Sequence, residues 1–453
     1  LLILGASGDL TARLLLPGLG SLLASGAAEG LSLIGSGADD WDDERWRKRV
    51  SESFAAAKAT GPEVDAVTES ARYLKADVTD EADLRELLDA CKGQVVIYFA
   101  LPPAVTEKAC LALTGVKLPV GTRLAMEKPF GTDAPSAGAL NALLARLVPE
   151  QQVHRVDHFL GMSTVLNVIG VRFANRIFEP VLNSDHVQSV DVQFDESLGL
   201  EGRAGYYDGA GALVDMIQSH LLQVLSLIAM DAPATLQERD LRDAKAEVLR
   251  ATSVWGGDPA ASSFRARYTA GEIDGRRLPS YVDEDGVDPA RDTETLAEVV
   301  FEVNTWRWAG VPFRLRSGKA IGNARKAVVI TFKEPQLLPT GLTGGHEPGR
   351  LHFGIGPGTD RLRLDINVSG PGDPFDIVQA ALEADLGAGE LPEYGEVLKG
   401  VLADDPTLSV RADMAVDCWR VIEPVQKAWR ENRVPLEDYP AGSSGPEGWP
   451  LAG

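Results

Sequence analysis

Cysteine, positive charge and long apolar runs are all scarce in this sequence of 453 residues. The three cysteines, Cys91, Cys110 and Cys418, stand far apart and show no Cys-x-x-Cys or His–Cys spacing, which excludes a disulfide scaffold and a recognisable zinc site. No run reaches the roughly 18 consecutive apolar residues that a membrane-spanning helix needs. No basic segment precedes the apolar start at residues 1–4, so we expect no signal peptide in this sequence and a reducing, cytoplasmic location.

Acidic residues outnumber basic ones, with 66 aspartates and glutamates against 44 lysines and arginines and a formal net charge of -22. A field of this sign repels nucleic acid and anionic membranes, so we expect neither as a partner. Hydrophobic residues at 44% and charged residues at 24% are ordinary for a folded protein, which excludes wholesale disorder. The length indicates two or three domains.

The first 150 residues alternate short apolar runs with helical patterns. Strands are predicted at Leu1–Leu4, Leu31–Gly35, Val95–Ala100 and Arg123–Glu127, and a helix at Arg13–Ala24. Strands separated by helices are typical of a parallel sheet, so residues 1–150 are predicted to form an α/β, Rossmann-type dinucleotide-binding domain. Residues 151–453 are predicted to form a larger α+β substrate-binding and oligomerisation domain with a mostly antiparallel sheet. Its predicted elements include strands at 187–194, 327–332 and 362–368 and a long helix at 209–229.

A glycine-rich turn, Gly5–Thr11, lies between the first predicted strand and the first predicted helix. Glycines there let the backbone approach a pyrophosphate, and the N-terminus of the helix offers unpaired N–H groups and the positive end of its dipole. The spacing differs from Gly-x-Gly-x-x-Gly, so on spacing alone a plain tight turn explains the segment equally well.

The residues around this turn make it more specific, because Gly5–Pro17 resembles the opening fingerprint of glucose-6-phosphate dehydrogenases. Nine later segments resemble further motifs of that family, in order: Glu127–Gly131, Arg155–Gly161, Arg172–Asn175, Phe178–Pro180, Glu201–Asp208, His220–Gln223, Trp308–Phe313, Arg316–Lys319 and Tyr439–Ser443. The resemblance covers essentially the whole chain. It implies an oxidoreductase of the pentose phosphate pathway that oxidises the C1 hydroxyl of glucose 6-phosphate to the 1,5-lactone and reduces a nicotinamide cofactor. It also implies a homodimer or homotetramer.

Oxidation at C1 needs a base for the hydroxyl proton, and histidine suits this role because its ordinary pKa is near neutrality. His220 follows Asp215 by five residues on a predicted amphipathic helix. On the residues alone, a structural histidine with local hydrogen bonds is the better interpretation. The resemblance implies instead that His220 is the base and that Asp157 is the carboxylate that orients it.

The resemblance also implies the two binding sites, and we expect no metal-binding residues. The implied hexose-binding residues are Lys128, His158, Phe159, Glu196, Asp215, Lys319 and Arg325. The implied cofactor-binding residues are Gly5, Ala6, Ser7, Gly8, Asp9, Leu10, Ser36, Asp39 and Lys128. By resemblance His158 contacts the phosphate and the Lys128–Pro129 bond is cis. Without the resemblance, Lys128 reads as a solvated residue at a strand end and Arg325 as a solvated strand edge.

One departure from the family pattern concerns the sugar phosphate. Met162 stands where the family signature has a lysine, and Phe159 replaces the commoner tyrosine. Losing one charge-assisted hydrogen bond costs about 1.5–3 kcal/mol. Glucose 6-phosphate stays the leading substrate, with a C6-sulfonated glucose or unphosphorylated glucose as alternatives. A non-catalytic regulatory paralogue is a further alternative, disfavoured because His220, Lys128 and Lys319 are all present.

A second departure concerns the cofactor. Ala38 stands where NADP-using relatives place an arginine, and Asp39 and Asp40 follow it. An acidic side chain at this place accepts hydrogen bonds from a ribose 2′-hydroxyl and repels a 2′-phosphate. The sequence therefore predicts a preference for NAD. NADP stays possible because Arg45 or Arg47 could reach back to this position.

Overall fold

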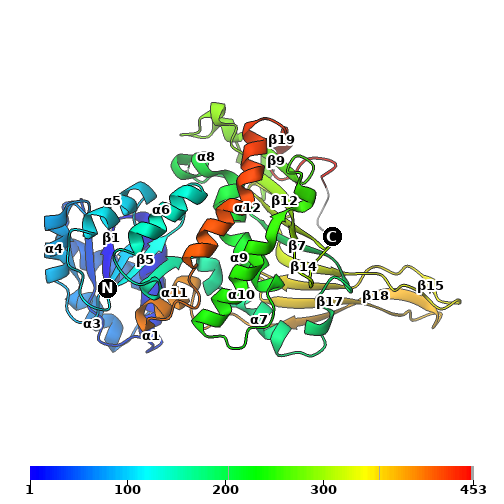
Figure 1. Cartoon of the computed structure of the whole chain (residues 1–453), viewed down its shortest axis with the longest axis horizontal. Coiled ribbons are helices and arrows are strands. Elements are labelled where there is room, and N and C mark those ends of the chain that lie inside the picture. Colours follow the sequence, from blue (N-terminus) through cyan, green and yellow to red (C-terminus); the bar gives the residue numbers. More distant parts are fainter. Residues whose placement is uncertain (203, 357, 450–453) are drawn as a thin grey trace. The chain divides into compact units, whose positions relative to one another are not determined.

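The computed structural model describes residues 1–202, 204–356 and 358–449, so Arg203 of the motif Glu201–Asp208 lies outside the described residues. The described chain forms two compact units (Figure 1). Unit 1 comprises Leu1–Met162, Pro233–Ala244 and Gly389–Trp419, and unit 2 comprises Ser163–Ala232, Lys245–Ala388 and Arg420–Gly453. Each unit thus combines three separate segments of the chain. The division into two successive domains at residue 150 stays a prediction.

Unit 1 is built on a parallel sheet, which has six strands in the described residues, in the order β3-β2-β1-β4-β5-β6. The strands are β1 (Leu2–Leu4), β2 (Ile34–Gly37), β3 (Arg72–Lys75), β4 (Val96–Phe99), β5 (Arg123–Glu127) and β6 (Val153–Val156). Every neighbouring pair is parallel. This order is that of dinucleotide-binding sheets, in which ligands lie beyond the carboxyl ends of β1 and β4. The predicted Rossmann-type fold is confirmed.

Helices cover both faces of this sheet (Figure 1). They are α1 (Leu16–Ala24), preceded by a π-helical turn η1 (Thr11–Leu15), α2 (Asp43–Ala56), α3 (Pro62–Ser70), α4 (Glu81–Asp89), α5 (Pro103–Leu113), α6 (Ala134–Leu144) and α11 (Glu393–Ala403). Successive residues of a strand point to opposite faces. Ile3 accordingly packs in one apolar cluster with Leu19 and Val50, and its neighbours Leu2 and Leu4 pack in another. Burial on both faces explains why these strands are uninterrupted apolar runs.

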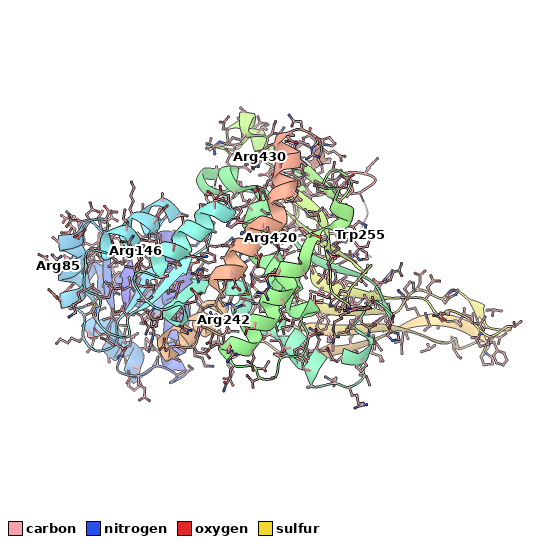
Figure 2. The ribbon with its side chains drawn as sticks, in the orientation of Figure 1. Arg85, Arg146, Arg242, Trp255, Arg420 and Arg430 are labelled. Atoms are coloured by element: carbon pink, nitrogen blue, oxygen red, sulfur yellow. The ribbon has the colours of Figure 1, made fainter. Side chains whose placement is uncertain are left out.

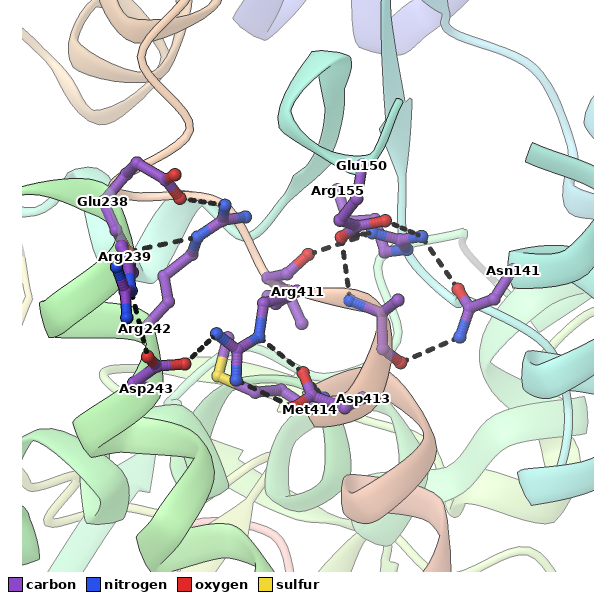
Figure 3. A network of polar contacts seen from close by, with 12 residues as sticks. Asn141, Glu150, Arg155, Glu238, Arg239, Arg242, Asp243, Arg411, Asp413 and Met414 are labelled. Carbon is purple, nitrogen blue, oxygen red and sulfur yellow. Dashed lines mark hydrogen bonds and ion pairs between the residues drawn. The ribbon is translucent and has the colours of Figure 1, made fainter. Parts of the chain in front are cut away.

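A polar network holds the returning segment 389–419 against β6 in unit 1 (Figure 3). The buried guanidinium of Arg155 donates to Glu150 at 2.7 Å, to Asn141 at 2.8 Å and to the carbonyl of Val410 at 3.4 Å. Ala412 closes the network, since its N–H donates to Glu150 at 3.0 Å and its carbonyl accepts from Asn141 at 2.8 Å. The network therefore fixes the strand that leads into Asp157 and His158.

Two further arginines continue this network (Figure 3). Arg411 forms two parallel hydrogen bonds of 2.8 Å with the carboxylate of Asp413 and also contacts Asp243. Arg242, which is almost completely buried, contacts Glu238 one helical turn before it. Bidentate arginine–carboxylate pairs are geometrically specific. The contact of Arg411 with Asp243 links segments 233–244 and 389–419 within unit 1.

Unit 2 contains a mixed sheet with eleven strands in the described residues, in the order β15-β18-β17-β16-β14-β7-β13-β12-β9-β19, with β8 beside β12. The strands are β7 (Val187–Asp195), β8 (Thr252–Val254), β9 (Ser263–Thr269), β12 (Leu296–Val303), β13 (Pro312–Gly318), β14 (Lys326–Phe332), β15 (Thr343–Gly344), β16 (Arg350–Gly354), β17 (Arg361–Ser369), β18 (Asp376–Asp385) and β19 (Leu436–Pro440). A separate hairpin pairs β10 (Gly271–Ile273) with β11 (Arg276–Leu278). Most pairings are antiparallel and three are parallel, so the predicted mostly antiparallel sheet is confirmed.

The helices of unit 2 include α7 (Ser163–Phe173), α8 (Ala204–Ala212), a π-helix η5 (Leu213–Leu221) and α9 (Leu222–Ala229). Helices α10 (Glu238–Ala251) and α12 (Ala412–Arg430) contribute residues to both units. Arg420 of α12 donates to the carbonyl of Leu249 at 2.7 Å, near the C-terminal end of α10 (Figure 2). The run Ala204–Ala229 is long and apolar enough to cross a membrane, but 83% of its most apolar window is buried inside the protein. Such burial is typical of a core helix.

Candidate active site

The predicted nucleotide turn begins where β1 ends. Gly5 has a φ of +88°, and a Cβ atom there would lie 2.2 Å from the carbonyl oxygen of Ala100, at the end of β4. Only glycine fits this close approach. The N–H groups of Gly5 and Ala6 donate to the carbonyl of Ser36, and Thr11 Oγ1 donates to the carbonyl of Gly5 at 3.1 Å. The turn is thus held between β2 and β4, at the edge where dinucleotides bind.

The carboxyl end of β2 carries the residues predicted to contact the ribose. Ser7 of the turn donates to Asp39 Oδ2 at 2.5 Å, which joins two predicted cofactor residues 32 positions apart. Tyr73 donates to the carbonyl of Asp39 at 3.2 Å, and burial raises the pKa of Tyr73, with the nearby Asp39 as the second cause. Ser36 was predicted to bind the cofactor. Its side chain is fully buried, and its backbone carbonyl accepts the hydrogen bonds that hold the turn.

Two arginines near this edge form cation–π contacts with one tryptophan ring. The guanidinium carbons of Arg45 and Arg49 lie 4.5 Å and 5.1 Å from the ring centroid of Trp41. Arg47 donates to the carbonyl of Ala71 at 2.9 Å. Arg45 and Arg47 were the side chains that could replace the missing arginine at position 38, and both have partners within their own region.

Strand register in unit 1 places two predicted site residues side by side. Glu127 of β5 pairs with Val156 of β6. The residues that follow, Lys128 and Asp157, therefore leave adjacent parallel strands at the same edge of the sheet. The Lys128–Pro129 peptide bond is cis, as the resemblance implied.

Asp157 and His158 begin a short 3₁₀ helix, His158–Gly161. Asp157 is buried, and its Oδ1 accepts the N–H of Phe159 at 3.0 Å. The His158 ring contacts Phe159 edge to face, with centroids 5.2 Å apart. Met162 ends this helix and is only 8% exposed. A lysine in the same place would need an anionic partner, because burying an unpaired charge is costly.

The same arrangement of strand ends recurs in unit 2. Asp195 of β7 pairs with Gly318 of β13, so Glu196 and Lys319 leave adjacent parallel strands together. Lys319 Nζ lies 2.6 Å from Glu196 Oε2, and the lysine side chain is 7% exposed. Lys319 Nζ also lies 5.0 Å from the ring centroid of Tyr207. The predicted sugar-binding lysine and carboxylate thus form one partly buried ion pair, in which the Glu196 side chain is 23% exposed.

Asp215 and His220 lie within the predicted helical run, on a segment that forms the π-helix η5. Five residues turn an α-helix through about 500°, which would place the two side chains on different faces. A π-helix forms hydrogen bonds between residues five apart, so both side chains lie on one face. His220 is 1% exposed. The first N–H of η5, that of Leu213, donates to the buried carboxylate of Glu294 at 2.9 Å.

Comparison with known protein families gives a match for each of the two parts of the chain. Residues 2–167 match the family described as "Glucose-6-phosphate dehydrogenase, NAD binding domain", and residues 169–450 match "Glucose-6-phosphate dehydrogenase, C-terminal domain". The chain belongs to the glucose-6-phosphate dehydrogenase family. The family, the fold and the class of NAD(P)-dependent dehydrogenase predicted from the sequence are therefore confirmed.

Individual members of the glucose-6-phosphate dehydrogenase family align with nearly the whole chain. The glucose-6-phosphate 1-dehydrogenase of Gluconobacter oxydans is 36% identical, over 98% of this chain and 94% of its own length. That of Treponema pallidum is also 36% identical, over 99% and 92%. A crystal structure of the Mycobacterium avium enzyme has a TM-score of 0.84 at 31% identity, over 98% and 94%. A structure described as glucose-6-phosphate dehydrogenase in complex with its substrate has a TM-score of 0.87 at 27% identity, over 99% and 95%.

Arg325, a further predicted sugar-binding residue, immediately precedes β14 (Lys326–Phe332). Its carbonyl accepts the N–H of Asp195 at 2.8 Å, so its backbone lies at the same sheet edge as Glu196. Its exposed side chain lines a small cavity of about 90 Å³ with Asp195 and Arg316. The role of Arg325 in sugar binding stays a prediction.

Three residues near the predicted site residues of this dehydrogenase were not among the site residues predicted from its sequence. Tyr207 is fully buried beside Lys319, and its pKa is raised well above the usual value by burial, then by Asp215 and other carboxylates. Glu127 and Tyr394 contact each other in unit 1, with Tyr394 Oη 3.4 Å from Glu127 Oε2. Tyr207 and Glu127 lie inside family motifs, a signal that pointed to them without assigning a role. Tyr394 has no such signal.

Proposed function

We propose that this protein oxidises the C1 hydroxyl of glucose 6-phosphate to the 1,5-lactone and transfers a hydride to a nicotinamide cofactor. The observation that carries the proposal is the match of the whole chain, in both halves, to relatives named for this activity. The grouping of predicted site residues at strand ends within each unit supports it.

In the proposed mechanism, His220 accepts the proton of the C1 hydroxyl while the C1–H bond breaks with its electron pair. The O–H electrons form the lactone carbonyl, so one proton and one hydride leave the sugar. When bound, the oxidised nicotinamide supplies the acceptor for that hydride. Asp157 is assigned to orient the imidazole and stabilise its protonated form, as carboxylates do beside catalytic histidines.

The remaining assignments concern sugar binding. The Glu196–Lys319 pair offers both an acceptor and a donor to the sugar hydroxyls, and Asp215 offers a further acceptor. His158 is assigned to the C6 phosphate, and Lys128 to both the sugar and the cofactor. A preformed ion pair fits hydroxyl recognition because neither charged group requires reorganisation on binding.

We further propose that NAD is preferred over NADP. The residues present fit a dinucleotide, because the turn at Gly5 and the following helix form the usual pyrophosphate cradle. Asp39 Oδ2 accepts from Ser7, so the carboxylate is held at the carboxyl end of β2 with acceptor capacity left for a ribose hydroxyl. A 2′-phosphate there would meet this negative charge and no arginine at position 38.

An Ala38→Arg variant is expected to raise the kcat/KM for NADP relative to NAD by about tenfold or more, because one charge-assisted hydrogen bond contributes about 1.5–3 kcal/mol. The measurement is kcat/KM with each cofactor at saturating sugar. Ala66→Arg, which adds the same charge to an exposed position of α3, is the control and should leave the ratio unchanged. An unaltered ratio in Ala38→Arg would contradict the ribose assignment.

The C6 substituent is tested by a matrix of NAD and NADP against glucose 6-phosphate, 6-deoxy-6-sulfoglucose and glucose. Glucose 6-phosphate is expected to give the highest kcat/KM. A higher value for the sulfonate or for glucose would favour the alternative suggested by Met162. Absence of hydride transfer with all three sugars would contradict the proposed function and favour a regulatory paralogue.

We infer that the active form is a homodimer or homotetramer in the cytoplasm. The exposed part of the sheet of unit 2 supports association, because several large apolar side chains on or beside β17 and β18 face solvent: Val368, Phe375, Val378, Leu382 and Leu386. Exposed apolar groups of this kind often mark protein interfaces. Light scattering is expected to give a mass that is two or four times 48.4 kDa, and a monomer at micromolar concentration would contradict the inference.

A further inference from the structure

A carboxylate and two tyrosines lie beside the residues of unit 1 that are predicted to bind the hexose. Glu127 ends β5, Tyr98 belongs to the neighbouring strand β4, and Tyr394 lies in the first turn of α11. The hydroxyl of Tyr98 donates to Glu127 Oε1, and the hydroxyl of Tyr394 donates to Glu127 Oε2 at 3.4 Å. Both tyrosines are buried. The two oxygens of one carboxylate thus hold two different elements.

Both ends of β5 hold helix α11. At the start of β5, Arg123 donates to the carbonyl of Leu402 at 2.6 Å and pairs with Asp404 at 3.0 Å, at the C-terminal end of α11. At the end of β5, Glu127 contacts Tyr394 at the N-terminal end of the same helix. The position of Tyr394 is therefore set by β5 at two points.

Close backbone packing leaves Tyr394 little room to move. A Cβ on Gly18 of α1 would lie 2.7 Å from the Cβ of Tyr394. A Cβ on Gly161, at the end of the His158 turn, would lie 2.5 Å from the carbonyl oxygen of Glu393. Glycine at both positions permits the backbone of α11 at Glu393 and Tyr394 to pack closely against α1 and the turn.

The Tyr394 ring packs against the imidazole ring of His158. The two rings are stacked, with centroids 5.9 Å apart and planes 14° from parallel. The Phe159 ring contacts the same imidazole edge to face. A change in the position of Tyr394 would therefore change the orientation of His158, the residue assigned to the C6 phosphate.

The charged and titratable groups around Glu127 are Tyr98 from β4, Tyr394 from α11, and Lys128 and Asp157 from the neighbouring strand ends. Burial raises the pKa of Glu127 to about 7, while the hydrogen bond from Tyr98 and the charge of Lys128 lower it. A carboxyl whose pKa is raised by desolvation beside specific charged partners is typical of a functional site.

We propose that Glu127 is a positioning residue for substrate recognition, which acts through the Tyr394 hydroxyl to fix the ring against which His158 is oriented toward the C6 phosphate. This inference rests on the proposed function. It assigns to Glu127 no contact with the reacting atoms. Its effect must depend on the C6 substituent, because it reaches the substrate through His158.

The test compares kcat/KM for glucose 6-phosphate and for glucose in the wild type and in Glu127→Gln, Tyr394→Phe and the double variant. Each single variant is expected to lower the ratio of the two kcat/KM values about three- to tenfold, the effect of one hydrogen bond. The double variant should lower it no further than the single variants, because both act on one contact. The inhibition constant of inorganic phosphate, measured against glucose 6-phosphate, should rise by the same factor.

The matched control is Tyr268→Phe. Tyr268 is a buried tyrosine of unit 2 whose hydroxyl donates to Glu284 at 2.9 Å, so the substitution removes the same kind of contact elsewhere. It should leave both the ratio of kcat/KM values and the inhibition constant unchanged. A merely structural role for Glu127 would lower kcat/KM for both sugars equally, and this result would overturn the inference.

His158→Gln separates failure of the inference from failure of the proposed function. A wild type that does not oxidise glucose 6-phosphate would contradict the proposed function itself. An unchanged ratio in His158→Gln would contradict the assignment of His158 to the phosphate and overturn the inference with it, while leaving the oxidation of glucose 6-phosphate untouched. A lowered ratio in His158→Gln together with unchanged ratios in Glu127→Gln and Tyr394→Phe would overturn only the inference. Additive effects in the double variant would also overturn it.

Discussion

Replacing His220 with asparagine is expected to lower kcat by about 10²–10⁴-fold, the usual contribution of a positioned general base. Asparagine keeps a hydrogen-bonding side chain of similar size but cannot accept the C1 hydroxyl proton at neutral pH. The KM for the sugar should change far less, because sugar binding is assigned to other residues. Initial rates of cofactor reduction at saturating sugar and cofactor, from pH 6 to 9, measure the effect.

His352→Asn is the matched control for this prediction. His352 is also paired with an aspartate, Asp365, at 2.8 Å, but it lies on β16 of the large sheet and not on η5. The control should retain wild-type kcat. A His220→Asn variant with more than about a tenth of the wild-type kcat would contradict the assignment of His220 as the base. Equal losses in both variants would indicate a general effect on folding.

Replacing Arg155 with methionine is expected to lower the free energy of unfolding by about 3 kcal/mol, the lower end of the range for breaking a buried ion pair. The lower end applies because Glu150 is 33% exposed and water can solvate it after the change. Asn141 and the carbonyl of Val410 would also lose a donor. The midpoint of urea-induced unfolding, followed by circular dichroism, measures the loss.

Arg85→Met serves as the control for this stability prediction. Arg85 lies on the exposed face of α4, where Figure 2 shows it at the surface of the ribbon. Surface substitutions of this kind usually change stability by no more than about 0.5 kcal/mol. An equal midpoint shift in both variants would show that the network of Figure 3 adds nothing beyond a surface charge.

Strands buried on both faces were predictable from their uninterrupted runs of apolar residues. The predicted strand Arg123–Glu127 coincides with β5, and Val95–Ala100 contains β4 (Val96–Phe99). The prediction was wrong in its boundary at β2, placed at Leu31–Gly35 but observed at Ile34–Gly37. Ser36 and Gly37 lie beyond the predicted end of this strand. They form a strand because β1 and β3 supply backbone partners on both sides.

The π-helix η5 illustrates a limit of reasoning from periodicity. The run Gly209–Ala229 is apolar enough to predict a helix, and a helix is found. Its hydrogen-bonding pattern depends on tertiary contacts, such as the bond from the N–H of Leu213 to Glu294, 81 residues away. Whether Asp215 and His220 share a face was therefore not readable from their spacing.

The sequence by itself determined the family, the nucleotide-binding turn, the apolar strands and the candidate residues, because local motifs and the burial of strands on both faces leave direct marks in residue type. Only the tertiary structure decided which strand ends are neighbours, and so which candidates meet. The Glu196–Lys319 pair depends on the register of β7 with β13, across 123 positions of sequence. Tyr394 reaches Glu127 because a segment from beyond the large sheet returns to unit 1. Such long-range pairings are selected by the packing of the whole unit, and no local pattern encodes them.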